Sequence, residues 1–181
     1  LALPLSSNPL LAAHVALATR LLDMPAQMFG AVTTPLVMNN LRRHRGHDQQ
    51  KRARLVTLGM VAIVATLFTA IAFVAVSTDE LLLSGTKWDG IGEVMAIMAL
   101  FYGSGALAGP LQEMGAFSSR PHSQMTANAV ALAAAAIVIW GFGSLSPALL
   151  AVIGLISLGR LLLHLRLTWT AIGDQRLANP S

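Results

Sequence analysis

The sequence has 181 residues, of which 55% are hydrophobic and only 11% charged, and its mean hydropathy is +0.65. Soluble domains have about one quarter charged residues, so this composition excludes an ordinary soluble domain and indicates a membrane protein. The net charge of +4 does not indicate a nucleic-acid partner, because no DNA- or RNA-binding motif accompanies the basic residues. The chain has no cysteine, which excludes disulfides and thiolate-ligated metals.

The first apolar segment covers residues 10–38 and contains Arg20, Asp23, Pro25 and Pro35. Charges at membrane depth are costly and usually face a bundle interior or a wet cavity, so we do not expect a plain lipid-facing helix here. The prolines predict kinks, which neighbouring helices or water make tolerable in a membrane. This segment is therefore predicted to be a bent transmembrane helix with one polar face.

The second apolar segment, residues 55–76, has no charged residue over 22 positions. A helix needs about 20 residues to cross the hydrocarbon core of a bilayer. Six of the twelve lysines and arginines lie just before it, in a predicted loop over 39–54, whereas Asp79 and Glu80 follow it. Because short basic loops stay on the cytoplasmic side, we predict that 39–54 is cytoplasmic and that 77–89 is external.

Three further apolar segments follow, and they are predicted to span the membrane at residues 91–116, 125–142 and 147–167. Trp88 precedes the first of them and is expected at headgroup level, where an amphipathic indole is favoured. The short connection over 141–147 predicts that the last two segments form an antiparallel hairpin.

The sequence thus predicts an all-α fold, a polytopic membrane bundle of about five transmembrane helices in a single domain over residues 1–181. The chain opens with Leu1, has no signal-peptide pattern and begins almost inside an apolar segment. We therefore expect it to be a fragment of a longer chain.

Three stretches carry a likeness to a known family. The first contains Ala16–Leu21, Pro25 and the segment 30–35, which ends at a proline before a polar loop; the second is 82–88, with Gly85 and Trp88; the third is the polar break over 115–120. Through these stretches the chain resembles the second half of the polysaccharide-export, O-antigen flippase-like branch of the multidrug/oligosaccharidyl-lipid/polysaccharide exporter superfamily. The likeness covers about residues 10–170.

The resemblance implies a two-lobed bundle of twelve or more helices that moves a lipid-linked oligosaccharide by alternating access. This chain would supply about five helices of the second lobe, with the missing N-terminal helices and the lipid bilayer as partners. The expected location is the bacterial cytoplasmic (inner) membrane, where such transport serves lipopolysaccharide and cell-envelope synthesis. Neither a cofactor nor a nucleic-acid partner is expected.

Arg20 and Asp23 are the candidate substrate-binding residues. They are three residues apart, so a helix places them on one face, where they can pair. One interpretation is a cavity-lining pair whose planar guanidinium binds the pyrophosphate of a lipid-linked sugar. The other is a structural ion pair that fixes this helix to a neighbour.

Hinge or packing roles are predicted for five small or proline residues: Pro25, Pro35, Gly105, Gly109 and Pro110. The two glycines form a GxxxG pattern, which allows helices to approach closely, and the proline after them allows bending. Static packing is the favoured interpretation and a moving hinge is the alternative.

No catalytic residue and no metal site is predicted. His44 and His47 lack a carboxylate or cysteine cluster to complete a metal site, and no nucleophile elbow is present. Glu93 and Glu113 could couple transport to a proton or cation, but twenty residues separate them by about 30 Å along a helix, so placement at the two interfaces is favoured.

Four functional hypotheses follow, and the leading one is a flippase for lipid-linked polysaccharide precursors. A multidrug exporter of the same superfamily is the second. A membrane-embedded glycosyltransferase or ligase is the third, and the short predicted outer loop argues against this enzyme. A purely structural membrane scaffold is the fourth, which would leave charged residues such as Arg20 without a cavity to face.

Overall fold

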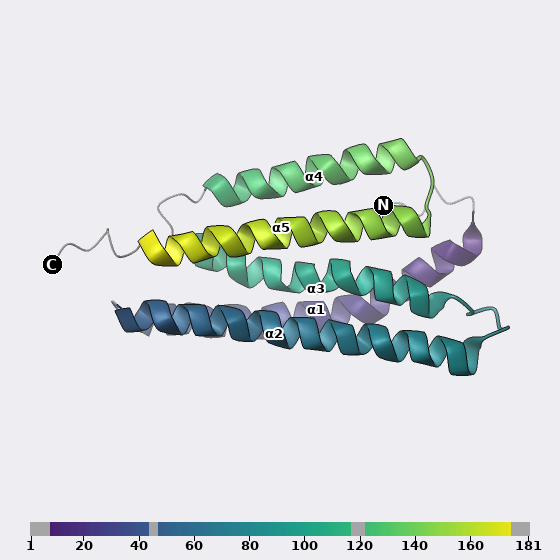
Figure 1. The fold of residues 1–181 in the computed structure, drawn as a ribbon, viewed down its shortest axis with the longest axis horizontal. Helices are drawn as coiled ribbons and strands as arrows, with labels where there is room; N and C mark the ends of the chain where they lie inside the picture. Colours follow the sequence, from purple (N-terminus) through teal and green to yellow (C-terminus); the bar gives the residue numbers. More distant parts are fainter. Residues whose placement is uncertain (1–7, 44–46, 117–121, 175–181) are drawn as a thin grey trace.

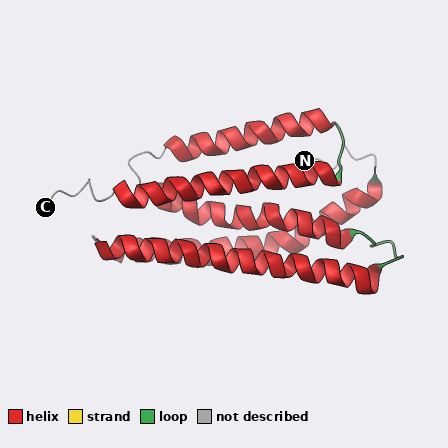
Figure 2. Cartoon of the chain, in the orientation of Figure 1, coloured by secondary structure: helices red, strands yellow, loops and turns green. Residues whose placement is uncertain are grey.

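The computed structural model describes residues 8–43, 47–116 and 122–174, and within these ranges the chain is helical apart from short turns. Its elements are α1 (Pro9–Arg43), α2 (His47–Thr78), the π-helix η2 (Asp79–Leu83), α3 (Ile91–Ala116), α4 (His122–Phe142) and α5 (Pro147–Asp174). The elements are all helical, as Figure 2 shows, and the prediction of an all-α membrane bundle is confirmed.

Helix α3 lies at the centre of the bundle and packs against α1, α2 and α5 (Figure 1). Helix α4 packs mainly against α5, which confirms the predicted hairpin. The core between these helices contains Leu22, Val64, Phe68 and Leu111, each less than 5% exposed. The start of α1 is inclined to the rest of that helix (Figure 1), as expected for a helix with prolines inside it.

Local sequence signals explain where α1 and α5 begin. The side-chain Oδ1 of Asn8 accepts hydrogen bonds from the backbone amides of Leu10 and Leu11, both at 3.1 Å. Ser146 does the same for α5, because its Oγ accepts from the amide of Leu149 at 3.2 Å. Each cap is followed by a proline at the first helical position, where the missing N–H costs nothing.

The α2–α3 turn is held together by a carboxylate. Asp79 accepts hydrogen bonds from the backbone amides of Gly90 at 3.3 Å and Gly92 at 2.9 Å, so the first residue of η2 caps the start of α3. Gly90 has a φ of +86°, a conformation that side chains disfavour. At Gly92 the helices approach so closely that a Cβ would lie 2.6 Å from the carbonyl oxygen of Ala75.

Four helices are long and apolar enough to cross a membrane: the segments Lys51–Leu83, Ile91–Glu113, His122–Phe142 and Pro147–Thr170. Helix α1 is not among them, and its crossing of the bilayer stays a prediction. Large apolar side chains of these helices are exposed, including Phe73 at 72% and Leu132 at 73%. Such surfaces are stable in hydrocarbon and not in water, so the fold is that of a multi-pass membrane protein.

The predicted loop over 39–54 is wrong in its extent. α1 continues to Arg43 and α2 already begins at His47, so Lys51 and Arg52 lie on the first turns of a helix. Lysine, arginine and glutamine are good helix formers, and long basic side chains can reach the interface from a helix end. The fifth helix is likewise longer than predicted, since α5 continues to Asp174.

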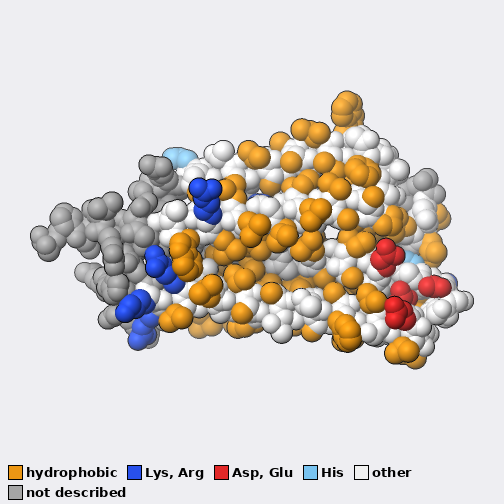
Figure 3. Space-filling view, viewed as in Figure 1, with side chains coloured by type: hydrophobic (Ala, Val, Ile, Leu, Met, Phe, Trp, Pro, Cys, Tyr) orange, Lys and Arg blue, Asp and Glu red, His pale blue; other side chains and the backbone are white. Residues whose placement is uncertain are grey.

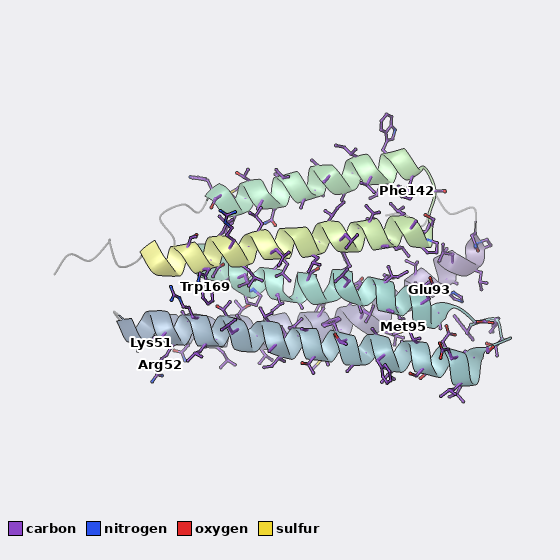
Figure 4. All side chains as sticks on the ribbon, in the orientation of Figure 1. Lys51, Arg52, Glu93, Met95, Phe142 and Trp169 are labelled. Carbon is purple, nitrogen blue, oxygen red and sulfur yellow. The ribbon has the colours of Figure 1, made fainter. Side chains whose placement is uncertain are left out.

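Charge is separated between the two ends of the bundle (Figure 3). We call one end the basic end, because Lys51, Arg52, Arg54 and Arg166 are exposed there, and the other the acidic end, which contains Asp79, Glu80, Asp89, Glu93 and a single lysine, Lys87. At the basic end the Arg54 guanidinium lies 5.0 Å from the ring centroid of Trp169 on α5. Figure 4 shows Trp169 on α5 close to the end of α2 that bears Lys51 and Arg52.

Candidate functional site

Arg20 lies on the wall of a groove between α1, α3 and the start of α5. The groove has a volume of about 580 Å³, within the range of small-molecule sites. Apolar and aromatic side chains form most of its surface, and Arg20 is the charged residue on it; the lining residues are Val15, Ala16, Thr19, Arg20, Met98, Phe101, Tyr102, Leu145, Leu150 and Ile153.

Asp23 lies in a second hollow, of about 310 Å³, further along α1 and α3. It shares Phe101 and Tyr102 with the first groove, so the two hollows adjoin across this aromatic pair. The two rings meet edge to face with their centroids 5.3 Å apart. We call the combined depression the α1–α3 groove; its second part is lined by Asp23, Ala26, Gln27, Gly30, Phe101, Tyr102, Gly105, Ala106, Gly109 and Pro110.

The predicted pairing of Arg20 with Asp23 is not seen. The Nε2 of Gln27, one turn further along α1, donates a hydrogen bond to the Asp23 carboxylate at 2.6 Å. Arg20 is exposed, and within the described ranges no salt bridge joins it to Asp23. The two residues lie on the same helix but line different parts of the groove. Their substrate-binding role stays a prediction.

The close helix packing predicted at the GxxxG pattern is not found between the described helices. Gly105 and Gly109 are exposed, and a Cβ built on either would have no atom within 4 Å. The residues between them point inward, since Ala106 and Leu107 are buried, and so is Pro110. The two glycines instead widen the α1–α3 groove. The hinge roles of Pro25, Pro35 and Pro110 stay predictions.

The remaining candidates do not gather into a site. Glu93 and Glu113 are exposed at opposite ends of α3, as interfacial placement requires. His44 lies outside the described residues, and the side chain of His47 is not among those described. In the described part of the chain, no group of three histidine or acidic side chains could hold a metal ion.

A buried polar cluster between α3, α4 and α5 was missed by the sequence reasoning. His164 is fully buried, and its Nε2 lies 3.0 Å from Oδ1 of Asn128, which also accepts from Nε2 of Gln112 at 3.2 Å. The hydroxyl of Thr168 donates to the backbone carbonyl of Leu111 at 3.2 Å. The cluster connects three helices through polar contacts, which membrane bundles use to fix helix position.

Spacing within the sequence could have indicated this cluster. Arg160, His164 and Thr168 recur every four residues on α5, which places them on one helix face, and Gln124 and Asn128 do the same on α4. The cluster is incompletely satisfied in the described structure. Buried atoms without a hydrogen-bond partner there are Gln124 Oε1, Arg160 Nε and His164 Nδ1. Such groups are unusual in folded proteins.

A second polar contact joins α3 to α5 nearer the acidic end. The hydroxyl of Ser104 donates to the hydroxyl of Ser157 at 2.6 Å, and both residues are buried. Close to it, a Cβ at Gly154 would lie 3.4 Å from Cδ2 of Leu100, which is ordinary van der Waals contact. This contact joins α3 to α5, two of the helices that line the first part of the α1–α3 groove.

The fold and these sites define a class: a multi-pass helical membrane protein with a partly polar groove beside its central helix. Comparison with family models, curated proteins and solved structures found no match to this chain.

Proposed function

We propose that this chain is part of a membrane flippase or exporter that moves lipid-linked oligosaccharide or polysaccharide precursors across the bacterial cytoplasmic membrane by alternating access. The observation that carries the proposal is Arg20 on the wall of the α1–α3 groove. Ionisable residues inside membrane bundles mark substrate or ion pathways by default. The O-antigen-type family resemblance of the sequence supports the same function.

With α1 placed across the bilayer, as the sequence predicts, the depth of Arg20 makes it a candidate ligand for an anionic group. It follows the helix start at Pro9 by eleven residues, which is about 16 Å along α1, half the thickness of the hydrocarbon core. Its planar guanidinium can bind two phosphate oxygens at once, as the pyrophosphate of a lipid-linked sugar would require. Asp23 is hydrogen-bonded to Gln27, and within the described ranges no salt bridge joins it to Arg20, whose exposed guanidinium can therefore bind a ligand.

The test is complementation of a surface-polysaccharide export defect by arginine variants. Arg20→Ala is expected to abolish export while the protein still reaches the membrane, and Arg20→Lys to retain part of it, because lysine keeps the charge but loses the bidentate geometry. Arg166→Ala is the matched control, since Arg166 is exposed at the basic end and should tolerate the change. Full export by Arg20→Ala would refute the proposal.

A multidrug exporter of the same superfamily is the second candidate, and Asp23 is the observation that favours it. This carboxylate borders the part of the groove that contains Phe101 and Tyr102, and a carboxylate beside aromatic faces suits a cationic amphiphile. If this function holds, Asp23→Asn should sensitise cells to cationic dyes while surface polysaccharide is unaffected.

A further inference from the structure

An apolar cavity of about 560 Å³ lies between α1, α2 and α3 at the acidic end of the bundle. Apolar side chains form nearly all of its surface, and among the lining side chains only those of Thr78 and Trp88 contain an oxygen or nitrogen atom. Met95 of α3, labelled in Figure 4, lies on this side of the bundle near the α2–α3 turn. The full lining is Leu17, Leu21, Leu67, Ala70, Ile71, Val74, Ala75, Thr78, Leu83, Trp88, Ile91 and Met95.

The cavity opens to the surroundings of the bundle and not to the α1–α3 groove. Leu21 is 51% exposed and Val74 is 60% exposed, so the walls on α1 and α2 continue into the outer surface. Helices α1 and α2 contact each other only sparsely. On α1, Arg20 faces the groove whereas Leu17 and Leu21 face the cavity. Helix α1 therefore separates the α1–α3 groove from the cavity.

We propose that this cavity is a lipid site that holds one acyl chain of a phospholipid from the surrounding bilayer. Its walls on α2 and α3 belong to helices that can cross a membrane, so the medium at its opening is hydrocarbon. An empty space with apolar walls loses the dispersion contacts that a chain would supply. Its volume suits one flexible chain. A lipid-linked substrate bound at Arg20 would lie on the other side of α1, so its own lipid tail is not the occupant proposed for this cavity.

The edge of the cavity can bind the phosphate of the same lipid. Trp88 lines the cavity and stacks on His14, with ring centroids 6.0 Å apart. The ammonium of Lys87 lies 5.6 Å from the centroid of the Trp88 ring. An indole beside a lysine is typical of headgroup level, where the cation attracts a lipid phosphate and the ring contacts the first part of the chain.

The acidic residues at this end favour a zwitterionic headgroup. Two of these carboxylates accept hydrogen bonds from backbone amides. Asp79 accepts from Gly90 and Gly92, and Asp89 accepts from Gly85 at 2.9 Å. The remaining two, Glu80 and Glu93, are exposed and repel a net negative lipid. Ethanolamine phospholipids combine a phosphate for Lys87 with an ammonium for these carboxylates, so this headgroup class fits the charges present.

Quenching of tryptophan fluorescence by brominated lipid tests the site. The chain has three tryptophans. Trp140→Phe with Trp169→Phe leaves Trp88 as the reporter in the cavity. Trp88→Phe with Trp169→Phe leaves Trp140, which is 86% exposed on α4 and reports ordinary lipid contact. Both proteins, purified in detergent and depleted of lipid, are titrated with phosphatidylethanolamine that has brominated acyl chains.

Quenching of Trp88 is expected to saturate near one lipid per chain, at a lipid concentration about tenfold lower than that for Trp140, which corresponds to 1.4 kcal/mol of preferential binding. Ala70→Phe fills the cavity from α2 and should remove this tenfold difference. Ala133→Phe, on the exposed face of α4, is the matched control and should preserve it.

Three results would overturn the proposal. Equal titration midpoints for Trp88 and Trp140 would mean that the cavity has no preference for lipid. Absence of Trp88 quenching at any lipid concentration would mean that another protein segment covers the opening. Recovery of Trp88 fluorescence on addition of one equivalent of unbrominated polyprenyl phosphate would mean that the cavity holds an isoprenoid chain.

Discussion

Replacement of Gly92 by alanine tests how tightly α2 and α3 meet at the acidic end. A Cβ at this position would lie 2.6 Å from the Ala75 carbonyl oxygen and 2.7 Å from the Asp79 Cβ, whereas real Cβ contacts stay beyond 3.0 Å. Two of the obstructing atoms are backbone atoms of α2, so the helices must separate. Overpacking of this kind typically costs about 1–3 kcal/mol.

For a chain of this size, each kcal/mol lowers the melting temperature by about 2–4 °C, so Gly92→Ala should melt roughly 2–12 °C below the wild type. Thermal melting in detergent, followed by circular dichroism, measures the change. Gly59→Ala is the control, because Gly59 lies inside α2 with no atom within 4 Å of its built Cβ, and alanine there favours the helix. Unchanged melting of Gly92→Ala would refute the close approach.

Three further changes have expected outcomes. Asp79→Ala removes the cap of α3 and should cost about 1–2 kcal/mol in a denaturant titration, whereas the exposed Glu80→Ala should change little. Cysteines introduced singly at positions 49 and 86 should react differently with an impermeant thiol reagent in intact cells. The cysteine at Thr86 should be labelled and the one at Gln49 should not. Labelling at Gln49 alone would contradict the predicted topology. Gly109→Leu should leave the melting temperature unchanged but narrow the α1–α3 groove and reduce transport.

Hydropathy and charge predicted the arrangement of helices well. Residues 91–116 were predicted as a transmembrane span, and α3 has the same bounds. A continuous apolar stretch between a turn and a polar segment can begin and end at few other positions. The start of α2 was predicted eight residues too late. Hydropathy registers where a helix leaves the hydrocarbon, not where its hydrogen bonds begin, and basic residues can continue a helix into the interface.

The candidate site was predicted only in part. Arg20 could be identified because a charge inside an apolar segment is conspicuous, but its groove is formed by α3 and α5, and no local pattern contains that contact. The GxxxG pattern at Gly105 and Gly109 was interpreted as packing, yet spacing alone does not tell which side of a helix meets a neighbour. The same limit applies to His164 and Asn128, whose contact depends on how α4 and α5 align.

Direct binding of a lipid-linked pyrophosphate to the protein tests the central claim that Arg20 recognises an anionic substrate. A fluorescent polyprenyl-pyrophosphate sugar is titrated into the wild type and Arg20→Ala in detergent, and Arg166→Ala is the control. Charge-assisted hydrogen bonds contribute about 1.5–3 kcal/mol, so the Kd of Arg20→Ala should rise about 10- to 150-fold, while that of Arg166→Ala should stay near the wild-type value. Equal Kd values for wild type and Arg20→Ala would contradict the assignment of the α1–α3 groove as the substrate site.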